Sequence, residues 1–251
     1  MKKVKLHGFV LKQSEYSESS LIIRFLSKEH GVIGIIAKGF RKNSEQRQLL
    51  NMGQYELGVV EPKEAGLWLL YDFDLLCDNS VFPASATWVA AECGLELLSK
   101  MIAPHEDFAL LYQLAQSYLA YLHGVTDNAI LIFWRLFFRV LRLSGIGSPL
   151  DACCVCNSAL RNYKVIDRQH WGFVCRDCEA EISDAEQVQH LSPESVEILR
   201  LLPEIGNHLQ SFKLGRKEVA EINHLLEMYW DAHHKQTLKL KSLSVLSQFY
   251  N

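Results

Sequence analysis

Four cysteines in two closely spaced pairs constrain this chain more than any other feature. The first pair is Cys153 and Cys156, the second is Cys175 and Cys178, and eighteen residues separate the two pairs. This C-x2-C…C-x2-C spacing is typical of sites that hold one tetrahedral zinc ion, because each pair can present two sulfurs from a tight turn. Four protein ligands leave no position for a substrate, so the expected zinc is structural. Asn157 follows the first pair, where such turns favour a left-handed residue.

Two other uses of the cysteines fit the sequence less well. A redox-active C-x2-C would follow a strand in a thioredoxin-like pattern, and neither pair does. A disulfide framework needs an oxidising compartment, but the chain opens Met-Lys-Lys-Val-Lys with no apolar signal segment. Cys154 could replace Cys153 in the ligand set, although the spacing favours Cys153. Cys77 and Cys93 lie among apolar residues and are expected in the core.

Five short segments before residue 80 are rich in β-branched and aromatic residues and are separated by turn sequences. They are residues 4–12, 20–27, 32–38, 54–61 and 67–76. Five consecutive strands of this length predict a small closed barrel, and the oligonucleotide-binding (OB) barrel is the commonest candidate. An SH3-like barrel fits the strand count nearly as well.

After Asn79 the apolar residues recur at helical spacing. Helices are predicted over 84–102, 106–122 and 127–144, and again over 216–234 and 242–249. Ser192 and Pro193 read as an N-cap and first helical residue, which opens a further helix to about Leu202. The expected fold class is α+β. An N-terminal five-stranded OB-type β-barrel (1–80) is followed by an all-helical domain (81–251) with an inserted four-cysteine zinc hairpin (150–180).

The charge is unevenly distributed along the chain. The net charge is only −3, but residues 1–50 hold ten Lys and Arg against four Asp and Glu. A basic amino-terminal segment on an otherwise acidic chain predicts a nucleic-acid footprint, with an ordinary solvated surface as the alternative. No run of about 18 apolar residues occurs, so the sequence predicts no membrane span.

One basic segment combines cations with an aromatic ring. Single-strand binding needs cations that follow the phosphates and aromatic faces on which bases stack. An exposed Phe40 is expected to supply the ring. The cations expected to bind DNA are Lys38, Arg41, Lys42 and Arg47, with Arg24 extending the patch. The alternative is that Phe40 packs over the end of the barrel and the cations only solvate the loop.

A second basic feature lies on the helix predicted over 127–144. Arg135, Arg139 and Arg142 recur at i, i+4 and i+7, so they share one face. The neighbouring aromatic residues are Phe133, Trp134, Phe137 and Phe138. The stripe is either a solvated helix face or a binding surface that combines guanidinium groups with aromatic rings.

The order of these parts resembles the RecO family, bacterial recombination mediators that work with RecR and RecA. The resemblance is carried by 7–11 (HGFVL), 16–21 (YSESSL), 31–32 (GV), 37–42 (AKGFRK), 141–146 (LRLSGI), 149–151 (PLD), 171–175 (WGFVC) and 242–249. These segments touch both ends and the middle of the chain in the family's order. No single segment is highly specific except the cysteine tetrad, but the ordered set is.

The resemblance implies a function that composition alone does not. It implies binding of single-stranded DNA, with double-stranded DNA as a further ligand, and annealing of strands. It also implies that the chain, with RecR, helps to load RecA onto DNA coated by single-stranded DNA-binding protein. The helical body would engage the acidic, phenylalanine-ended tail of that protein. Three arginines, Arg135, Arg139 and Arg142, suit such a ligand, and Arg135 is the first choice of contact residue. The implied location is cytoplasmic and nucleoid-associated, without membrane contact.

Catalysis has little support in the sequence. No G-x-x-x-x-G-K-[ST], H-E-x-x-H or G-x-S-x-G motif occurs, so we expect a protein that is not an enzyme. His233 and His234, with Asp231, lie near a predicted helix end and are expected to be surface residues or caps. The rival interpretations are a zinc-containing nucleic-acid enzyme such as a nuclease, and a scaffold that binds only proteins.

Overall fold

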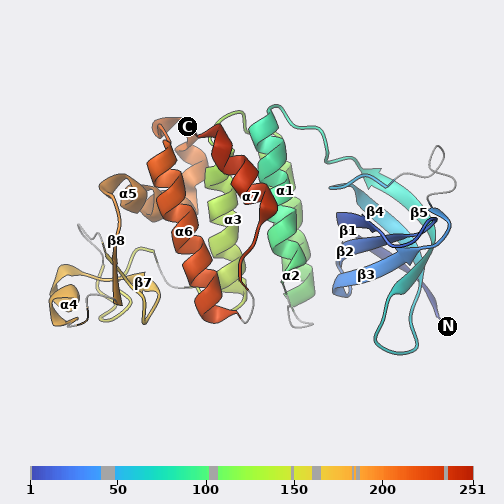
Figure 1. Ribbon diagram of the computed structural model, residues 1–251, viewed down its shortest axis with the longest axis horizontal. Helices are drawn as coiled ribbons and strands as arrows, with labels where there is room; N and C mark the ends of the chain where they lie inside the picture. Colours follow the sequence, from blue (N-terminus) through green and yellow to red (C-terminus); the bar gives the residue numbers. More distant parts are fainter. Residues whose placement is uncertain are drawn as a thin grey trace. The chain divides into compact units, whose positions relative to one another are not determined.

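The structure, a computed structural model, describes residues 2–40, 49–101, 107–147, 150–159, 165–182, 184, 187–234 and 237–250. The chain divides by its internal contacts into two compact units, residues 1–129 and 130–251. This boundary lies after the second helix, whereas the boundary expected at residue 80 marks the change from strands to helices. The two units are described separately below (Figure 1).

Five strands in the first unit form a closed barrel. They are β1 (Lys3–Glu15), β2 (Leu21–Ser27), β3 (Gly31–Ala37), β4 (Gln54–Val60) and β5 (Trp68–Cys77). Their order is β1-β2-β3-β5-β4, with β1 pairing back onto β4. All pairs are antiparallel except β3 with β5. The five predicted strands are confirmed, and this strand order with its parallel closing pair is that of an OB barrel rather than an SH3-like one.

Alternate strand residues fill the inside of the barrel, as the period of two requires. The buried core includes Leu6, Val10, Ile23, Phe25, Ile35, Tyr55, Leu57, Val59 and Trp68. Two residues from the connection between β3 and β4, Phe40 and Leu49, join the same core. Burial of each large apolar side chain contributes about 1.5–3 kcal/mol, so the connection is held at both ends where it leaves and re-enters the barrel.

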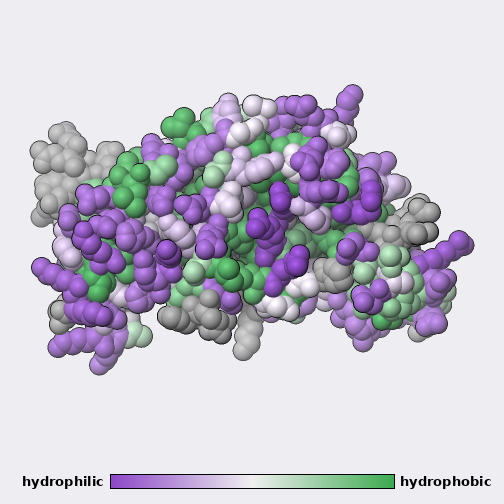
Figure 2. Space-filling view, turned by 180° about the vertical axis from the view of Figure 1, so that it is seen from behind, coloured by the Kyte–Doolittle hydropathy of each residue, from purple (hydrophilic) through white to green (hydrophobic). Residues whose placement is uncertain are grey.

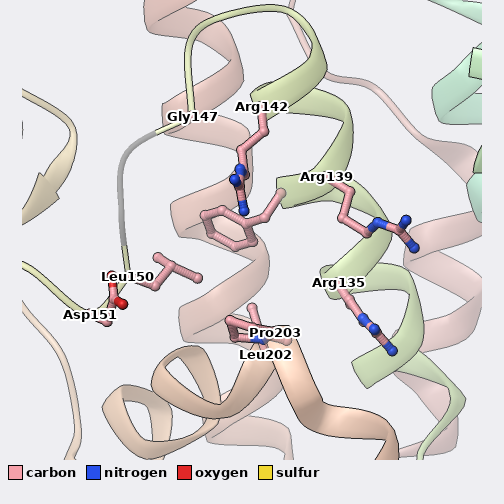
Figure 3. A pocket seen from close by; sticks show the side chains of 9 residues that line it. Arg135, Arg139, Arg142, Gly147, Leu150, Asp151, Leu202 and Pro203 are labelled. Atoms are coloured by element: carbon pink, nitrogen blue, oxygen red, sulfur yellow. The ribbon is translucent and has the colours of Figure 1, made fainter. Parts of the chain in front are cut away.

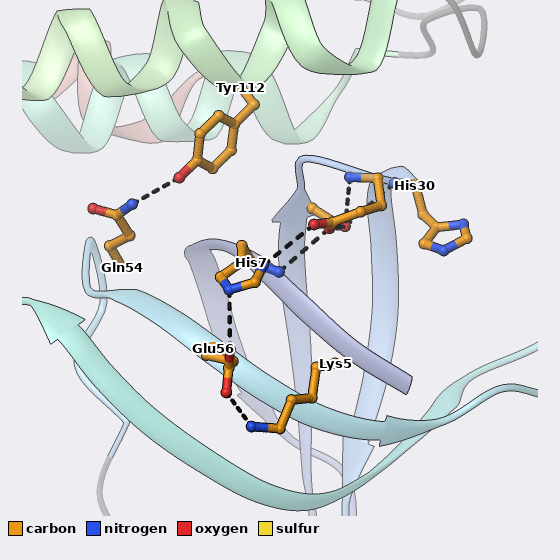
Figure 4. Close-up of polar contacts among 8 residues, drawn as sticks. Lys5, His7, His30, Gln54, Glu56 and Tyr112 are labelled. Atoms are coloured by element: carbon orange, nitrogen blue, oxygen red, sulfur yellow. Dashed lines mark hydrogen bonds and ion pairs between the residues drawn. The ribbon is translucent and has the colours of Figure 1, made fainter. Parts of the chain in front are cut away.

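Two helices, α1 (Ser85–Ser99) and α2 (Phe108–Leu122), pack against each other and against the barrel. The side-chain amide of Gln54 donates to the Tyr112 hydroxyl at 2.7 Å (Figure 4), and the Phe9 and Tyr112 rings lie 5.2 Å apart. Gly31 has a φ of +63°, and a Cβ there would lie 2.6 Å from the ring of Phe108. Helix α2 therefore covers the end of the barrel that carries the turn between β2 and β3.

The second unit is built on helices, as the sequence predicts. They are α3 (Ala129–Leu143), α5 (Pro193–Leu201), α6 (Arg216–His233) and α7 (Lys241–Leu246), with the 3-10 segments η4 (Leu202–Asn207), η5 (Leu209–Ser211) and η6 (Ser247–Phe249). The Ser192 hydroxyl accepts from the backbone N–H of Ser195 at 3.3 Å, which confirms the expected N-cap. Trp134 is fully buried and donates to Asn223 of α6 at 2.8 Å.

A small cysteine-bearing module lies between α3 and α5 in the chain. Its strands are β6 (Val165–Asp167), β7 (Gly172–Phe173) and β8 (Val188–His190), in the order β7-β6-β8, and its helix is α4 (Arg176–Glu181). Trp171, at the turn between β6 and β7, places its ring 5.4 Å from Tyr229 and 6.1 Å from His233. These ring contacts anchor the module to α6.

Within the described ranges, no helix is long and apolar enough to cross a membrane. Hydrophilic side chains cover much of the face in Figure 2, with smaller hydrophobic areas between them.

Candidate metal centre, arginine pocket and nucleic-acid interface

The structure brings the four predicted cysteines together. The sulfurs of Cys153, Cys156, Cys175 and Cys178 all lie within 4.8 Å of one another. The Cys156 and Cys175 sulfurs are 3.7 Å apart. Tetrahedral Zn–S bonds of about 2.3 Å place sulfurs roughly 3.8 Å apart, so this spacing fits a zinc ion. Four thiols at this spacing could hold one metal ion.

Local backbone structure explains how the first cysteine pair is presented. The backbone N–H of Cys153 donates to the Ser158 carbonyl, and that of Asn157 donates to the Cys153 carbonyl, both at 2.9 Å. Asn157 has a φ of 57°, which confirms the expected left-handed residue. The second pair begins one residue before α4, and the N–H of Cys175 donates to the Cys153 sulfur at 3.4 Å.

The electrostatics of the cluster favour thiolates at Cys153 and Cys156 and a thiol at Cys178. Hydrogen bonds from the hydroxyl and backbone of Ser158 lower the pKa of Cys156 to about 6. Burial opposes ionisation of Cys153, but backbone N–H groups outweigh it, and the pKa of Cys153 is lowered. The hydrogen bond with Cys175 raises the pKa of Cys178, because neighbouring sulfurs share a proton. A metal ion would replace such shared protons.

Cys154 lies outside the group of four. Burial raises the pKa of its thiol to about 11, so it stays protonated, and its backbone N–H donates to the Phe173 carbonyl at 2.9 Å. The structure therefore selects Cys153 over Cys154. Cys93 is buried, as expected, but the expectation of a buried Cys77 is wrong: Cys77 is exposed at the end of β5. The strand there runs on past the barrel core, and Leu75 and Leu76 are about half exposed as well.

The three predicted arginines lie along α3 and line a pocket of about 630 Å³ (Figure 3). The opposite side is formed by the segment after α3 and by the junction of α5 with η4. The other lining residues are Phe138, Gly147, Leu150, Asp151, Leu202 and Pro203. Arg139 and Arg142 are exposed and Arg135 is half-buried. Among the residues that the structure describes, none of these three guanidinium groups forms an ion pair.

The aromatic part of the expected surface needs a correction. Phe133, Trp134 and Phe137 are fully buried, so they belong to the core of the second unit. Only Phe138, of the four rings, lines the pocket. Most of α3 is covered on all sides, and its arginines mark the face that remains open. Desolvation, and then repulsion from Arg135, lower the pKa of Arg139, but an arginine remains charged at any physiological pH.

The structure also corrects the basic segment of the barrel. Phe40 is 3% exposed, and its ring lies 5.5 Å from that of Phe73. The expectation that Phe40 is exposed for base stacking is therefore wrong, and its ring packs into the end of the barrel. Lys38 is exposed immediately after β3. Arg41, Lys42 and Arg47 lie outside the described residues.

The remaining barrel cations are partly engaged. Arg24 is exposed on β2 and donates to the Ser99 carbonyl at 3.1 Å. The Lys5 ammonium pairs with Glu56 at 2.5 Å, and Glu56 also contacts His7 at 3.0 Å (Figure 4). The hydrogen bond to Lys5 lowers the pKa of Glu56. Lys5 and Glu56 therefore neutralise each other, whereas Lys38 remains exposed at the end of β3.

The two histidines at the end of α6 and the neighbouring Asp231 have a structural role. His233 and His234 place Nδ1 at 2.8 and 3.1 Å from the carbonyls of Tyr229 and Trp230. The Asp231 carboxylate accepts from the backbone N–H of Leu238 at 2.9 Å. These contacts satisfy the last turn of α6, so the expectation of caps is confirmed.

A closed OB-type barrel followed by a helical unit with an inserted four-cysteine cluster defines the class of protein by its architecture. Two family models match the chain: "Recombination protein O N terminal" over residues 1–75 and "Recombination protein O C terminal" over residues 86–243. The chain belongs to the RecO family.

Three relatives named "DNA repair protein RecO" show how the similarity extends along the chain. The Bacillus pumilus protein is 25% identical over 244 residues, covering 95% of this chain and 92% of the relative. The Bacillus subtilis protein is 23% identical, with 94% and 92% covered. The Exiguobacterium sibiricum protein is 26% identical, with 98% and 97% covered.

Proposed function

We propose that this chain is a DNA-repair mediator that binds single-stranded DNA on its barrel and a partner protein on its helical unit. Membership of the RecO family carries the proposal, and the separation of an OB barrel from an arginine-lined pocket supports it. In this account the chain acts without catalysis. It anneals strands and, with RecR, helps RecA to replace single-stranded DNA-binding protein. Double-stranded DNA is a further ligand in this account.

The DNA site in this proposal is the end of the barrel where β3 runs into the basic segment. Lys38, Arg41, Lys42 and Arg47 would follow the phosphates, and Arg24 on β2 would extend the patch. Neutralising two strands on such a surface lowers their mutual repulsion, which is how binding promotes annealing. Because counterions are released, affinity should fall steeply as salt rises.

The partner site in this proposal is the arginine pocket. An acidic peptide that ends in phenylalanine offers carboxylates to Arg135, Arg139 and Arg142 and a ring to the apolar wall of Phe138, Leu150 and Leu202. Charge-assisted pairs to arginine are stronger and more directional than contacts with lysine. The tail of single-stranded DNA-binding protein has this chemistry, and Arg135 is our first choice of contact because it is the most buried of the three.

The metal in this proposal is one structural zinc ion held by Cys153, Cys156, Cys175 and Cys178. It would close a module with very little core of its own, and structural zinc contributes on the order of 10 kcal/mol of folding free energy in small modules. When bound, the zinc ion would hold the four cysteine thiolates in place.

One set of titrations separates the mediator from its rivals. Fluorescence anisotropy of a labelled single strand, measured over a salt series, should show tight binding that weakens with salt. A protein-only scaffold would leave the anisotropy unchanged. The same strand, incubated for hours with magnesium or manganese and run on a gel, should stay intact and should anneal faster to its complement. Cleavage of the strand would establish the nuclease instead.

Calorimetry with an acidic, phenylalanine-ended peptide tests the partner site. Arg135→Ala should abolish or strongly weaken binding while DNA affinity stays unchanged. Arg200→Ala is the matched control, because Arg200 is an exposed α5 arginine that pairs with Glu197 at 2.6 Å outside the pocket. Wild-type peptide affinity in the Arg135 variant would contradict the partner site. The three arginines would then form an ordinary solvated helix face.

A further inference from the structure

The burial of Phe40 leaves the proposed DNA interface without the aromatic ring that single-strand binding needs. The structure supplies another at the same end of the barrel. Tyr16 lies in the connection between β1 and β2, and 63% of its surface is exposed, more than for any other aromatic side chain that the structure describes. Covering such a ring with a ligand is favourable, because it removes apolar surface from water.

Strand register places this connection beside the basic segment. Leu21 of β2 pairs with Glu15 on one side and with Ala37 on the other. Tyr16 follows Glu15, and Lys38 follows Ala37. Neighbouring strands lie about 4.8 Å apart, so the backbones at Tyr16 and Lys38 are on the order of 10 Å apart. A ring and an ammonium group at that separation can contact adjacent nucleotides of one strand.

The far end of the basic segment returns to the same hairpin. The side-chain amide of Gln13 on β1 donates to the Leu49 carbonyl at 2.8 Å and to Asn51 at 3.0 Å. The chain thus enters the basic segment beside β2 and leaves it beside β1. Ala37 at the end of β3 lies beside β2 and Leu49 lies beside β1, so these two residues flank the hairpin that carries Tyr16.

The hairpin connection is held in a defined shape by its own backbone. The N–H of Tyr16 donates to the Ser20 carbonyl at 3.1 Å, and the N–H of Ser20 donates to the Ser17 carbonyl at 3.4 Å. Ser20 is buried, which ties the base of the connection to the barrel. A ring on a short, tied connection costs little ordering entropy when a ligand binds.

We infer that Tyr16 is the residue on which a DNA base stacks at this interface. The inference rests on the proposed function and adds its base-binding component. Glu15 and Glu18 lie close to Tyr16 in the sequence. Their carboxylates disfavour phosphate at the tip, so Tyr16 contributes through the base face and not through charge. The stacking contribution is therefore independent of salt, whereas the Lys38 contribution depends on it.

Anisotropy with a labelled oligothymidine at several salt concentrations tests this assignment. Tyr16→Ala should weaken binding on the order of tenfold, with the slope of log affinity against log salt unchanged. Tyr16→Phe should stay within about twofold of wild type, because it keeps the ring. Tyr71→Ala is the matched control. Tyr71 is 45% exposed, and Lys3 lies 5.0 Å from its ring centroid on another part of the barrel.

An abasic oligonucleotide of the same length separates stacking from a structural role. Wild type should bind it on the order of tenfold more weakly than oligothymidine, and that difference should vanish in Tyr16→Ala. If Lys38→Glu weakens binding but Tyr16→Ala does not, the inference is overturned and the interface stands. If neither variant changes affinity, the DNA lies elsewhere, and both the inference and the proposed barrel site fail.

Discussion

Replacing Glu221 with glutamine should destabilise the second unit, because this carboxylate joins α6 to the start of α5. Its oxygens accept from the Ser192 backbone at 2.9 Å, from the Ser192 hydroxyl at 2.6 Å and from the Ser195 hydroxyl at 2.5 Å. Hydrogen bonds to a charged group contribute about 1.5–3 kcal/mol each. Glutamine keeps one acceptor oxygen and loses the charge, so we expect the free energy of unfolding to fall by about 2 kcal/mol.

The effect should depend on pH with a definite sign. Burial opposes ionisation of Glu221, but the bonds from Ser192 and Ser195 outweigh it and hold the pKa of Glu221 below its ordinary value of 4.5. A carboxyl with a lowered folded-state pKa stabilises the fold above its unfolded-state pKa. That stabilisation is lost as the pH falls through the folded-state pKa. Glutamine does not titrate, so the gap between wild type and variant should be full at pH 7 and shrink below about pH 4.

Urea unfolding, followed by tryptophan fluorescence at pH 7 and pH 3.5, measures this gap. Trp134, Trp171 and Trp230 report on the second unit. Glu197→Gln is the control, since Glu197 lies on α5 and pairs only with the exposed Arg200 among the partners that the structure gives it. The Glu197→Gln control should lower the free energy of unfolding by less than about 1 kcal/mol. An equal loss at both pH values, or no loss at pH 7, would refute the role given to the Glu221 carboxylate.

Other expected outcomes follow from the barrel core and the metal module. Phe40→Ala should cost about 3–5 kcal/mol of barrel stability by chemical denaturation, and Phe40→Leu much less; an unchanged midpoint for alanine would contradict the packing against Phe73. Cys175→Ser should lower zinc content, measured by elemental analysis of protein refolded with zinc, and raise hydrogen exchange in the module. The same variant should weaken peptide binding in the arginine pocket, because Leu150 and Asp151 form part of its wall just before Cys153. Undiminished zinc content or peptide affinity would count against these roles.

Much of this architecture could be predicted from the sequence, because its signals are local. The cysteine spacing, the strand and helix periods and the Ser192-Pro193 cap each depend on a few neighbouring residues. Phe40 is one exception, because Lys-Gly-Phe-Arg-Lys is typical of an open basic loop. Gly39 has a φ of +70°, and at this turn Phe40 is packed into the barrel, which no local pattern reveals.

The pocket shows the other limit of sequence reasoning. Helical spacing aligned Arg135, Arg139 and Arg142 correctly, but it could not show which aromatic neighbours are buried. Part of the opposite wall comes from Leu202 and Pro203, about sixty residues further along the chain. Such a wall depends on how α5 and η4 pack, and packing between distant segments leaves no periodic signal. In the sequence, Tyr16 is only part of a segment that resembles the RecO family. The strand register brings it near Lys38.

The salt dependence of single-strand binding tests the central claim most directly. Lys38→Glu, Arg41→Glu and Lys42→Glu, combined in one variant, should weaken binding and reduce the slope of log affinity against log salt by about 0.7 for each phosphate that is no longer neutralised. Thermal stability should change little, because exposed sites such as Lys38 usually matter by less than about 0.5 kcal/mol. A triple variant that binds with wild-type affinity and wild-type slope would contradict the claim that this end of the barrel holds the DNA.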